Sequence, residues 1–193
     1  MNFRFFPGWM GKVISDPSGF WKTFNDEEPR LSTIKNSILF PLTVLPALFA
    51  LAGSLIFTNT HLAAIYSFLY AMQYFAALMI SVFVSAAAVT LSARRIHPNL
   101  RYSMALVIVI YSLVPFFLCQ MVSRLFESFQ FVNILGLYGL MIFWSALEEV
   151  LNTPRDKKPV LLIAAFVSFI LAFAVSDLVL GVLADKIYFS YFA

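Results

Sequence analysis

Five apolar runs separated by short polar segments fill residues 36–193. Each run approaches or exceeds the roughly 20 apolar residues that a helix needs to cross a bilayer. The pattern therefore predicts an all-α, polytopic transmembrane helical bundle with five spans. We place these spans at about 36–57, 62–92, 102–123, 129–149 and 160–182.

Proline residues interrupt two of these spans. Pro41 and Pro46 lie in the first span, and Pro115 lies near the middle of the third. Membrane helices tolerate proline because neighbouring groups satisfy the carbonyl groups that it frees. We interpret the prolines as structural kinks, and hinges for transport are the alternative interpretation.

The second span is longer than a bilayer requires, so it must tilt or extend beyond the membrane. Small residues recur along it at every fourth position, at Ala77, Ser81 and Ser85. This spacing lets two helices approach closely. We predict that the three residues form a helix-packing seam, either inside the bundle or against a second copy of the chain.

Residues 1–35 form a separate segment that is amphipathic rather than apolar. Asp16 can cap a short helix on which Phe20, Trp21 and Phe24 share one face. Aromatic and basic side chains on a short helix are typical of a segment that lies along the lipid headgroups. Packing against the cytosolic end of the bundle is a second interpretation, and the two are compatible.

The composition favours a membrane protein. Hydrophobic residues make up 61% of the chain and charged residues only 12%, whereas a soluble domain carries about 25% charged residues. The formal net charge is +3. The positive residues fall in short loops rather than on one broad face, so we expect no binding to nucleic acid, which needs many phosphate contacts.

Lysine and arginine are unevenly divided between the two sides of the predicted bundle. One side holds Arg4, Lys12, Lys22, Arg30, Lys35, Arg94, Arg95, Arg101, Arg155, Lys157 and Lys158. Only Arg124 and Lys186 fall on the other side. Because positively charged loops stay in the cytosol, the N-terminus is predicted to be cytosolic and the C-terminus to lie outside.

The sequence contains no recognisable catalytic, cofactor-binding or metal-binding motif. Glu148 and Glu149 resemble the paired glutamates of membrane-embedded CAAX-type proteases. That family also needs an arginine where this chain has Thr153, and histidines inside later spans, which this chain lacks. We therefore predict no enzyme, and we expect the glutamates to lie at the membrane interface near the cations of residues 155–158.

Charged residues inside the apolar runs are few, and Arg124 and Asp177 lie near the outer side. An isolated charge in a membrane is costly and is usually paired, so we predict that these two residues pair. An ion or proton site at Asp177 is the functional alternative. Gln73, Gln120 and Asn133 are candidates for hydrogen bonds between helices.

Three segments carry a resemblance to a known family: Asp16-Pro-Ser-Gly-Phe-Trp-Lys22 followed by Glu27 or Glu28, Tyr111-Ser-Leu-Val-Pro115, and residues 134–157 with their Thr-Pro-Arg-Asp-Lys ending. Together they resemble the Yip1 domain family over nearly the whole chain. The resemblance implies a five-span bundle with a cytosolic N-terminus. The chain lacks the long hydrophilic arm of the eukaryotic members, so binding of small GTPases is not expected. It is similar to prokaryotic members, which implies a bacterial inner membrane.

Charges within these segments predict a cytosolic cluster. Asp156 can cap the last helix, and Arg155 or Lys157 can meet Glu27 or Glu28. Such a cluster would clamp the amphipathic segment onto the bundle. Exposed pairs contribute only about 0–1 kcal/mol to stability. The cluster would therefore mainly fix how the amphipathic segment lies against the bundle, or offer a docking site for a partner.

These features predict a non-enzymatic integral membrane protein that organises membrane or partner proteins at the cytosolic face. The expected partners are anionic lipids of the bilayer, another membrane protein, or a second copy of the chain. The alternative is a small-solute or ion transporter or channel that uses the kinked spans and Asp177.

Overall fold

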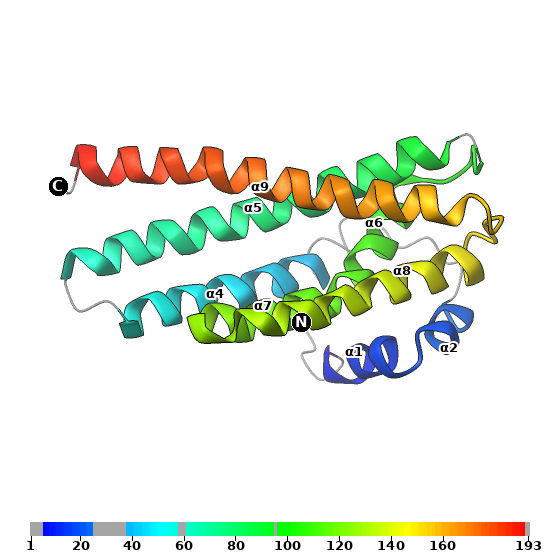
Figure 1. Ribbon diagram of the computed structural model, residues 1–193, viewed down its shortest axis with the longest axis horizontal. Helices are drawn as coiled ribbons and strands as arrows, with labels where there is room; N and C mark the ends of the chain where they lie inside the picture. Colours follow the sequence, from blue (N-terminus) through cyan, green and yellow to red (C-terminus); the bar gives the residue numbers. More distant parts are fainter. Residues whose placement is uncertain (1–5, 25–37, 58–60, 95, 192–193) are drawn as a thin grey trace.

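The computed structural model describes residues 6–24, 38–57, 61–94 and 96–191, and all regular structure within them is helical, as predicted. Two short helices, α1 (Phe6–Ser15) and α2 (Pro17–Lys22), precede the bundle. The bundle consists of α4 (Phe40–Phe57), α5 (His61–Ala93), α6 (Tyr102–Ser112), α7 (Val114–Leu125), the 3-10 helix η3 (Glu127–Leu137), α8 (Tyr138–Glu149) and α9 (Lys158–Tyr191) (Figure 1).

Three helical segments of the described chain are long and apolar enough to cross a membrane: Ala64–Ala93, Ser128–Glu149 and Lys158–Ser190. The bent pair α6–α7 makes a fourth candidate when it is counted as one span. Helix α4 is apolar but shorter, with Phe40–Ile56 as its apolar part. The described residues therefore give three or four candidate spans where the sequence predicts five.

The third predicted span is broken in the middle. Helix α6 ends at Ser112, α7 begins at Val114, and the two helices are bent by 46°. Pro115 lies in the first turn of α7, where a missing N–H is tolerated although it could not continue α6. The N–H of Leu113 still bonds to the carbonyl oxygen of Val109 at 3.0 Å. The third span is therefore bent next to Pro115, whereas α4, for which a kink is predicted, forms one continuous helix through Pro46.

The fourth predicted span begins in an unexpected conformation, because its first half is wound as the 3-10 helix η3. Phe126 is extended, with φ −128° and ψ 104°, and Phe129 departs from helical geometry. The chain thereby folds back along α7. The Ser123 hydroxyl donates to the Asn133 side-chain oxygen at 3.1 Å and joins the two helices.

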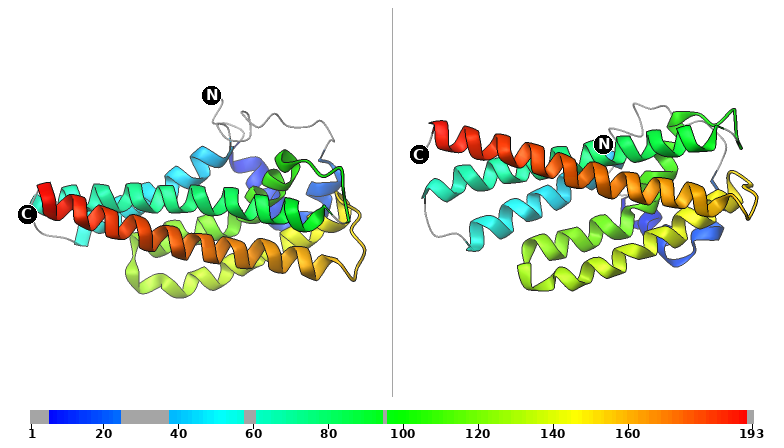
Figure 2. Two further views of the ribbon diagram at one scale, coloured as in Figure 1. Left: turned by 90° about the horizontal axis from the view of Figure 1, so that it is seen from above. Right: turned by 45° about the horizontal axis from the view of Figure 1, so that its top comes forward.

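Helices α5 and α9 form a long antiparallel pair (Figures 1 and 2). Helix α9 contains 34 residues, which corresponds to a length of about 51 Å. It continues well past the predicted end of the last span at residue 182. The Tyr66 hydroxyl donates to the Asp185 carboxylate at 3.2 Å, so the contact persists beyond the predicted span.

The predicted small-residue seam of α5 is buried inside the chain. Ala77, Ser81 and Ser85 are all buried. The Ser85 hydroxyl donates to the carbonyl oxygen of Ala165 in α9 at 2.8 Å. A hydrogen bond at this point requires the close helix approach that small residues allow.

Helix α6 occupies the centre of one half of the bundle, and every residue from Ala105 to Ser112 is buried. A helix that is apolar on all sides needs partners on all sides. Two glycines allow α8 and α4 to approach the broken α6–α7 span very closely. A Cβ added at Gly139 of α8 would lie 2.2 Å from the Ser112 carbonyl oxygen, and one at Gly53 of α4 would lie 2.2 Å from that of Arg124.

We expect Gly139→Ala to lower the thermal unfolding midpoint in detergent, because its Cβ would collide with the backbone oxygen of Ser112. Overpacking of this kind typically costs about 1–3 kcal/mol. Gly11→Ala is the matched control, since nothing lies within 4 Å of a Cβ built at Gly11 in α1. Equal midpoints for the two variants would contradict the close approach of α8 to α6.

Candidate functional site at the basic end of the bundle

The loop that joins α5 to α6 and the loop that joins α8 to α9 lie at the same end of the bundle (Figure 1). His97 Nε2 lies 3.1 Å from Thr153 Oγ1, which ties the two loops together. Both loops carry exposed cations, namely Arg94, Arg101, Arg155 and Lys157. We call this end, with its two loops, the basic end.

The turn between α8 and α9 is shaped by the Thr-Pro-Arg-Asp-Lys motif and the residue before it. Asn152 has a φ of 47°, a left-handed conformation that asparagine tolerates better than most residues. The Thr153 N–H then bonds to the Leu147 carbonyl oxygen at 2.9 Å and satisfies one of the last acceptors of α8. This places Thr153, which is buried, against His97.

Helix α2 is held by its own cap and by a buried tryptophan. The Asp16 carboxylate accepts a hydrogen bond from the Gly19 N–H at 2.9 Å, which confirms the predicted cap. Trp21 is only 2% exposed, and its indole N–H donates to the carbonyl oxygen of Ile142 in α8 at 3.2 Å. A buried indole combines a large contact area with one directional bond, so it fixes both the position and the register of α2.

The aromatic face of α2 packs around Tyr111 at the end of α6. The ring centroids of Phe20, Trp21 and Phe24 lie 5.1, 5.8 and 6.2 Å from that of Tyr111. The tryptophan meets the tyrosine edge to face, at 86°, which is a favoured aromatic geometry. The face predicted from the sequence therefore contacts the bundle.

A second anchor lies near the junction of α1 with α2. The Tyr138 hydroxyl at the start of α8 donates to the Ile14 carbonyl oxygen of α1 at 2.8 Å. Helix α2 therefore packs against α8, and the end of α1 is tied to the start of the same helix. The N-terminal segment is fixed to the bundle at two separate places.

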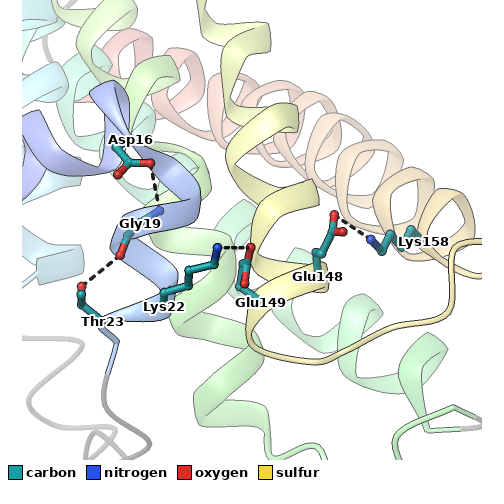
Figure 3. A network of polar contacts seen from close by, with 7 residues as sticks. All are labelled: Asp16, Gly19, Lys22, Thr23, Glu148, Glu149 and Lys158. Carbon is teal, nitrogen blue, oxygen red and sulfur yellow. Dashed lines mark hydrogen bonds and ion pairs between the residues drawn. The ribbon is translucent and has the colours of Figure 1, made fainter.

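Each of the two glutamates at the end of α8 faces a lysine from a different helix (Figure 3). Lys22 Nζ of α2 lies 3.6 Å from Glu149 Oε1, and Lys158 Nζ of α9 lies 2.9 Å from Glu148 Oε2. The Lys158 side chain is only 3% exposed and also lies over the Trp144 ring. The last turn of α8 thus joins α2 to α9 through charge.

Only part of the predicted cytosolic cluster lies among the described residues. Glu27 and Glu28 lie outside the described residues, so their pairing with Arg155 or Lys157 stays a prediction. Lys157 Nζ lies 3.5 Å from Asp156 Oδ2, and both side chains are well exposed. Asp156 makes this contact rather than the predicted cap of the last helix.

Sequence reasoning missed Lys22 and had placed Lys158 near the two glutamates without choosing a partner for either carboxylate. Neighbouring glutamates at the end of one helix point about 100° apart around its axis, because an α-helix has 3.6 residues per turn. From this 100° separation, separate partners for Glu148 and Glu149 could have been predicted.

Arg124 and Asp177 lie in the opposite half of the bundle and do not form the predicted ion pair within the described contacts. Arg124 donates to the Tyr70 hydroxyl, and its guanidinium carbon lies 4.3 Å from the Tyr74 ring centroid. Asp177 instead accepts a hydrogen bond from Gln73 Nε2 at 3.0 Å. Helix α5 lies between the two charges and supplies a partner for each, which the apolar pattern could not reveal.

The three predicted interhelical amide contacts are present. Gln73 joins α5 to α9 through Asp177, Gln120 accepts from the Tyr74 hydroxyl at 2.7 Å, and Asn133 joins η3 to α7. Polar contacts of this kind hold membrane helices together where lipid provides no hydrophobic drive between them. One oxygen of the Asp177 carboxylate is used in this helix contact, and the structure gives no support to an ion site there.

We expect Trp21→Phe to release α1 and α2 from α8, because the variant removes the indole donor to the Ile142 carbonyl oxygen. Loss of a buried hydrogen bond costs about 1–3 kcal/mol. Amide exchange of residues 6–24 should therefore rise about tenfold or more, as measured by mass spectrometry.

Lys22→Ala is the control for Trp21→Phe, since the Lys22 side chain is 64% exposed and exposed pairs contribute about 0–1 kcal/mol. Its exchange should rise only slightly. Equal exchange in the two variants would show that Trp21 is not the main anchor.

A family model for the Yip1 domain matches residues 11–176. No curated protein and no solved structure matches the chain. The matched range runs from α1 into α9 and includes α2, the junction of α6 with α7, and α8 with the turn that follows it. The chain therefore belongs to the Yip1 domain family.

Proposed function

We propose that this integral membrane protein is not an enzyme and that it organises membrane or partner proteins through its basic end. The observation that supports this proposal best is the junction at that end, where Trp21 and the pairs of Glu148 and Glu149 hold three helices together. Exposed cations surround this fixed scaffold. Each cation near a membrane surface attracts anionic lipid by about 1 kcal/mol.

The proposal includes an orientation with the basic end in the cytosol of a bacterial cell. We take α4 as the first of five spans, because it has 18 residues without charge, or about 27 Å, close to the roughly 30 Å of a hydrocarbon core. The other spans are then α5, α6–α7, η3–α8 and α9. Five crossings place the C-terminus outside, and the Lys22 end of α2 lies at the cytosolic headgroups.

Thiol labelling tests this orientation. Asn99→Cys and Lys186→Cys, each in a Cys119→Ala background, introduce one exposed thiol into a loop of the basic end and one near the end of α9. A membrane-impermeant maleimide added to intact cells should label residue 186 and leave residue 99 unlabelled until the cells are opened. The reverse pattern, or labelling of both in intact cells, would contradict five spans in this orientation.

Native mass spectrometry of the protein released from its own membrane tests the function. We expect a stoichiometric membrane-protein partner, or a homo-oligomer that retains anionic lipid. The double variant Arg155→Glu with Lys157→Glu should lose most of this binding, because it reverses two exposed charges of the basic end. Lys186→Glu, at the other end of α9, is the matched control and should bind normally.

Two results would contradict the proposal. One is a lone protomer that retains neither protein nor anionic lipid. The other is a protomer that carries a small solute and loses it in Asp177→Asn, since that result would indicate transport.

A further inference from the structure

A half-open cavity of about 190 Å³ lies between α9 on one side and η3 and α8 on the other. Its floor is the bend between α6 and α7, with Val109, Leu113 and Phe116. Figure 2 shows why the space exists: α8 and α9 meet at the basic end and diverge towards the opposite end. The cavity lies away from the charged cluster of the basic end.

The lining of the cavity is almost entirely hydrocarbon. Its polar members already have partners within the chain. The Ser85 hydroxyl donates to Ala165, the Ser112 hydroxyl donates to the Ile108 carbonyl oxygen at 2.7 Å, and the Asn133 oxygen accepts from Ser123. A solute or water would find few groups to bind, whereas an apolar cavity of about 150 Å³ stays dry and binds benzene-sized hydrocarbon.

The rim of the cavity faces the bilayer. Ile170 of α9 and Leu137 of η3 line it and are 45% and 49% exposed. Both belong to segments that are long and apolar enough to cross a membrane. Around such segments, the medium outside the protein is lipid tails.

We propose that this cavity binds one acyl chain of a bilayer lipid. The lining on α9 runs from Leu162 to Ile170, about 12 Å along the helix, which is close to half of the roughly 30 Å hydrocarbon core. The nearest cation along α9 is Lys158, one turn before Leu162, and its ammonium group is already paired with Glu148. The site therefore recognises the tail of the lipid and not its headgroup.

The bound chain contacts α8 on a different face from the one that meets the N-terminal helices. Gly139 lines the cavity, while the neighbouring Tyr138 bonds to α1. The same two turns of α8 thus contact the acyl chain on one side and the N-terminal segment on the other. This role is independent of the exposed cations of the proposed cytosolic surface.

Photo-crosslinking in nanodiscs tests the site. The probes are phosphatidylcholine and phosphatidylglycerol that carry a diazirine in one acyl chain, and the readout is the modified peptide found by mass spectrometry. We expect labelling of Phe116 on the floor with both lipids, at a level comparable to Leu178, which is 68% exposed on α9. Arg155→Glu with Lys157→Glu should leave the labelling of Phe116 unchanged.

Two cavity-filling variants make the test specific. Leu140→Trp and Ala165→Leu add volume to opposite walls, and each should reduce labelling of Phe116 at least fivefold without affecting Leu178. Val167→Phe is the matched control, because Val167 is exposed on α9 and does not line the cavity. The unfolding midpoint of each variant shows that it is folded.

Several results would overturn the proposal. Phe116 could remain unlabelled while Leu178 is labelled, or its labelling could persist in both filled variants. A cross-link from Phe116 to a second copy of the chain would assign the cavity to a protein side chain. Labelling by phosphatidylglycerol alone would show that the headgroup is recognised.

Discussion

The break at Leu113 in the central span is the constraint on which the rest of the structure depends. Helix α6 has 11 residues, about 17 Å, so it cannot cross a bilayer without α7. It is buried on every side and therefore needs neighbours all around it. Those neighbours are α5, α8 and, through Tyr111, the aromatic face of α2. The N-terminal segment thus completes the core around α6.

The bend also divides the bundle into two halves with different chemistry. In the half that ends at the loops, Trp21 and two lysine–glutamate pairs join helices near the water. In the other half, Tyr70 and Tyr74 surround the charge of Arg124 within the bundle. Aromatic faces attract a cation most strongly where water is excluded. The partly buried arginine therefore packs with aromatic rings and a hydroxyl group within the bundle.

Most of the helices could be predicted from the sequence, because apolar runs and loop charges report directly on membrane burial. Pro115 indicated the kink, Asp16 indicated a cap, and the spacing of Phe20, Trp21 and Phe24 indicated a packed face. These are local signals, in which residue type or spacing alone determines the structure. They also located the segments that meet at the basic end.

Other features depend on which helices become neighbours, and these neighbours could not be predicted from residue type or spacing. The partner of Arg124 is a tyrosine on α5, and the partner of Glu149 is a lysine on α2. The 3-10 winding of η3, which packs along α7, is another such feature, since its apolar pattern resembles that of an α-helix. Helix α4 begins at Phe40 in the described part of the chain, and residues 36 and 37 of the predicted first span lie outside that part.

The central claim is that α2 and α8 are held side by side at the basic end in the native membrane. A cysteine pair, Lys22→Cys with Glu149→Cys in a Cys119→Ala background, tests it most directly with a short membrane-permeant bis-maleimide. The account predicts an efficient intramolecular cross-link for this pair and none for Lys22→Cys with Lys186→Cys, because Lys186 lies near the far end of α9. Absence of the first cross-link, or equal cross-linking of both pairs, would contradict the account.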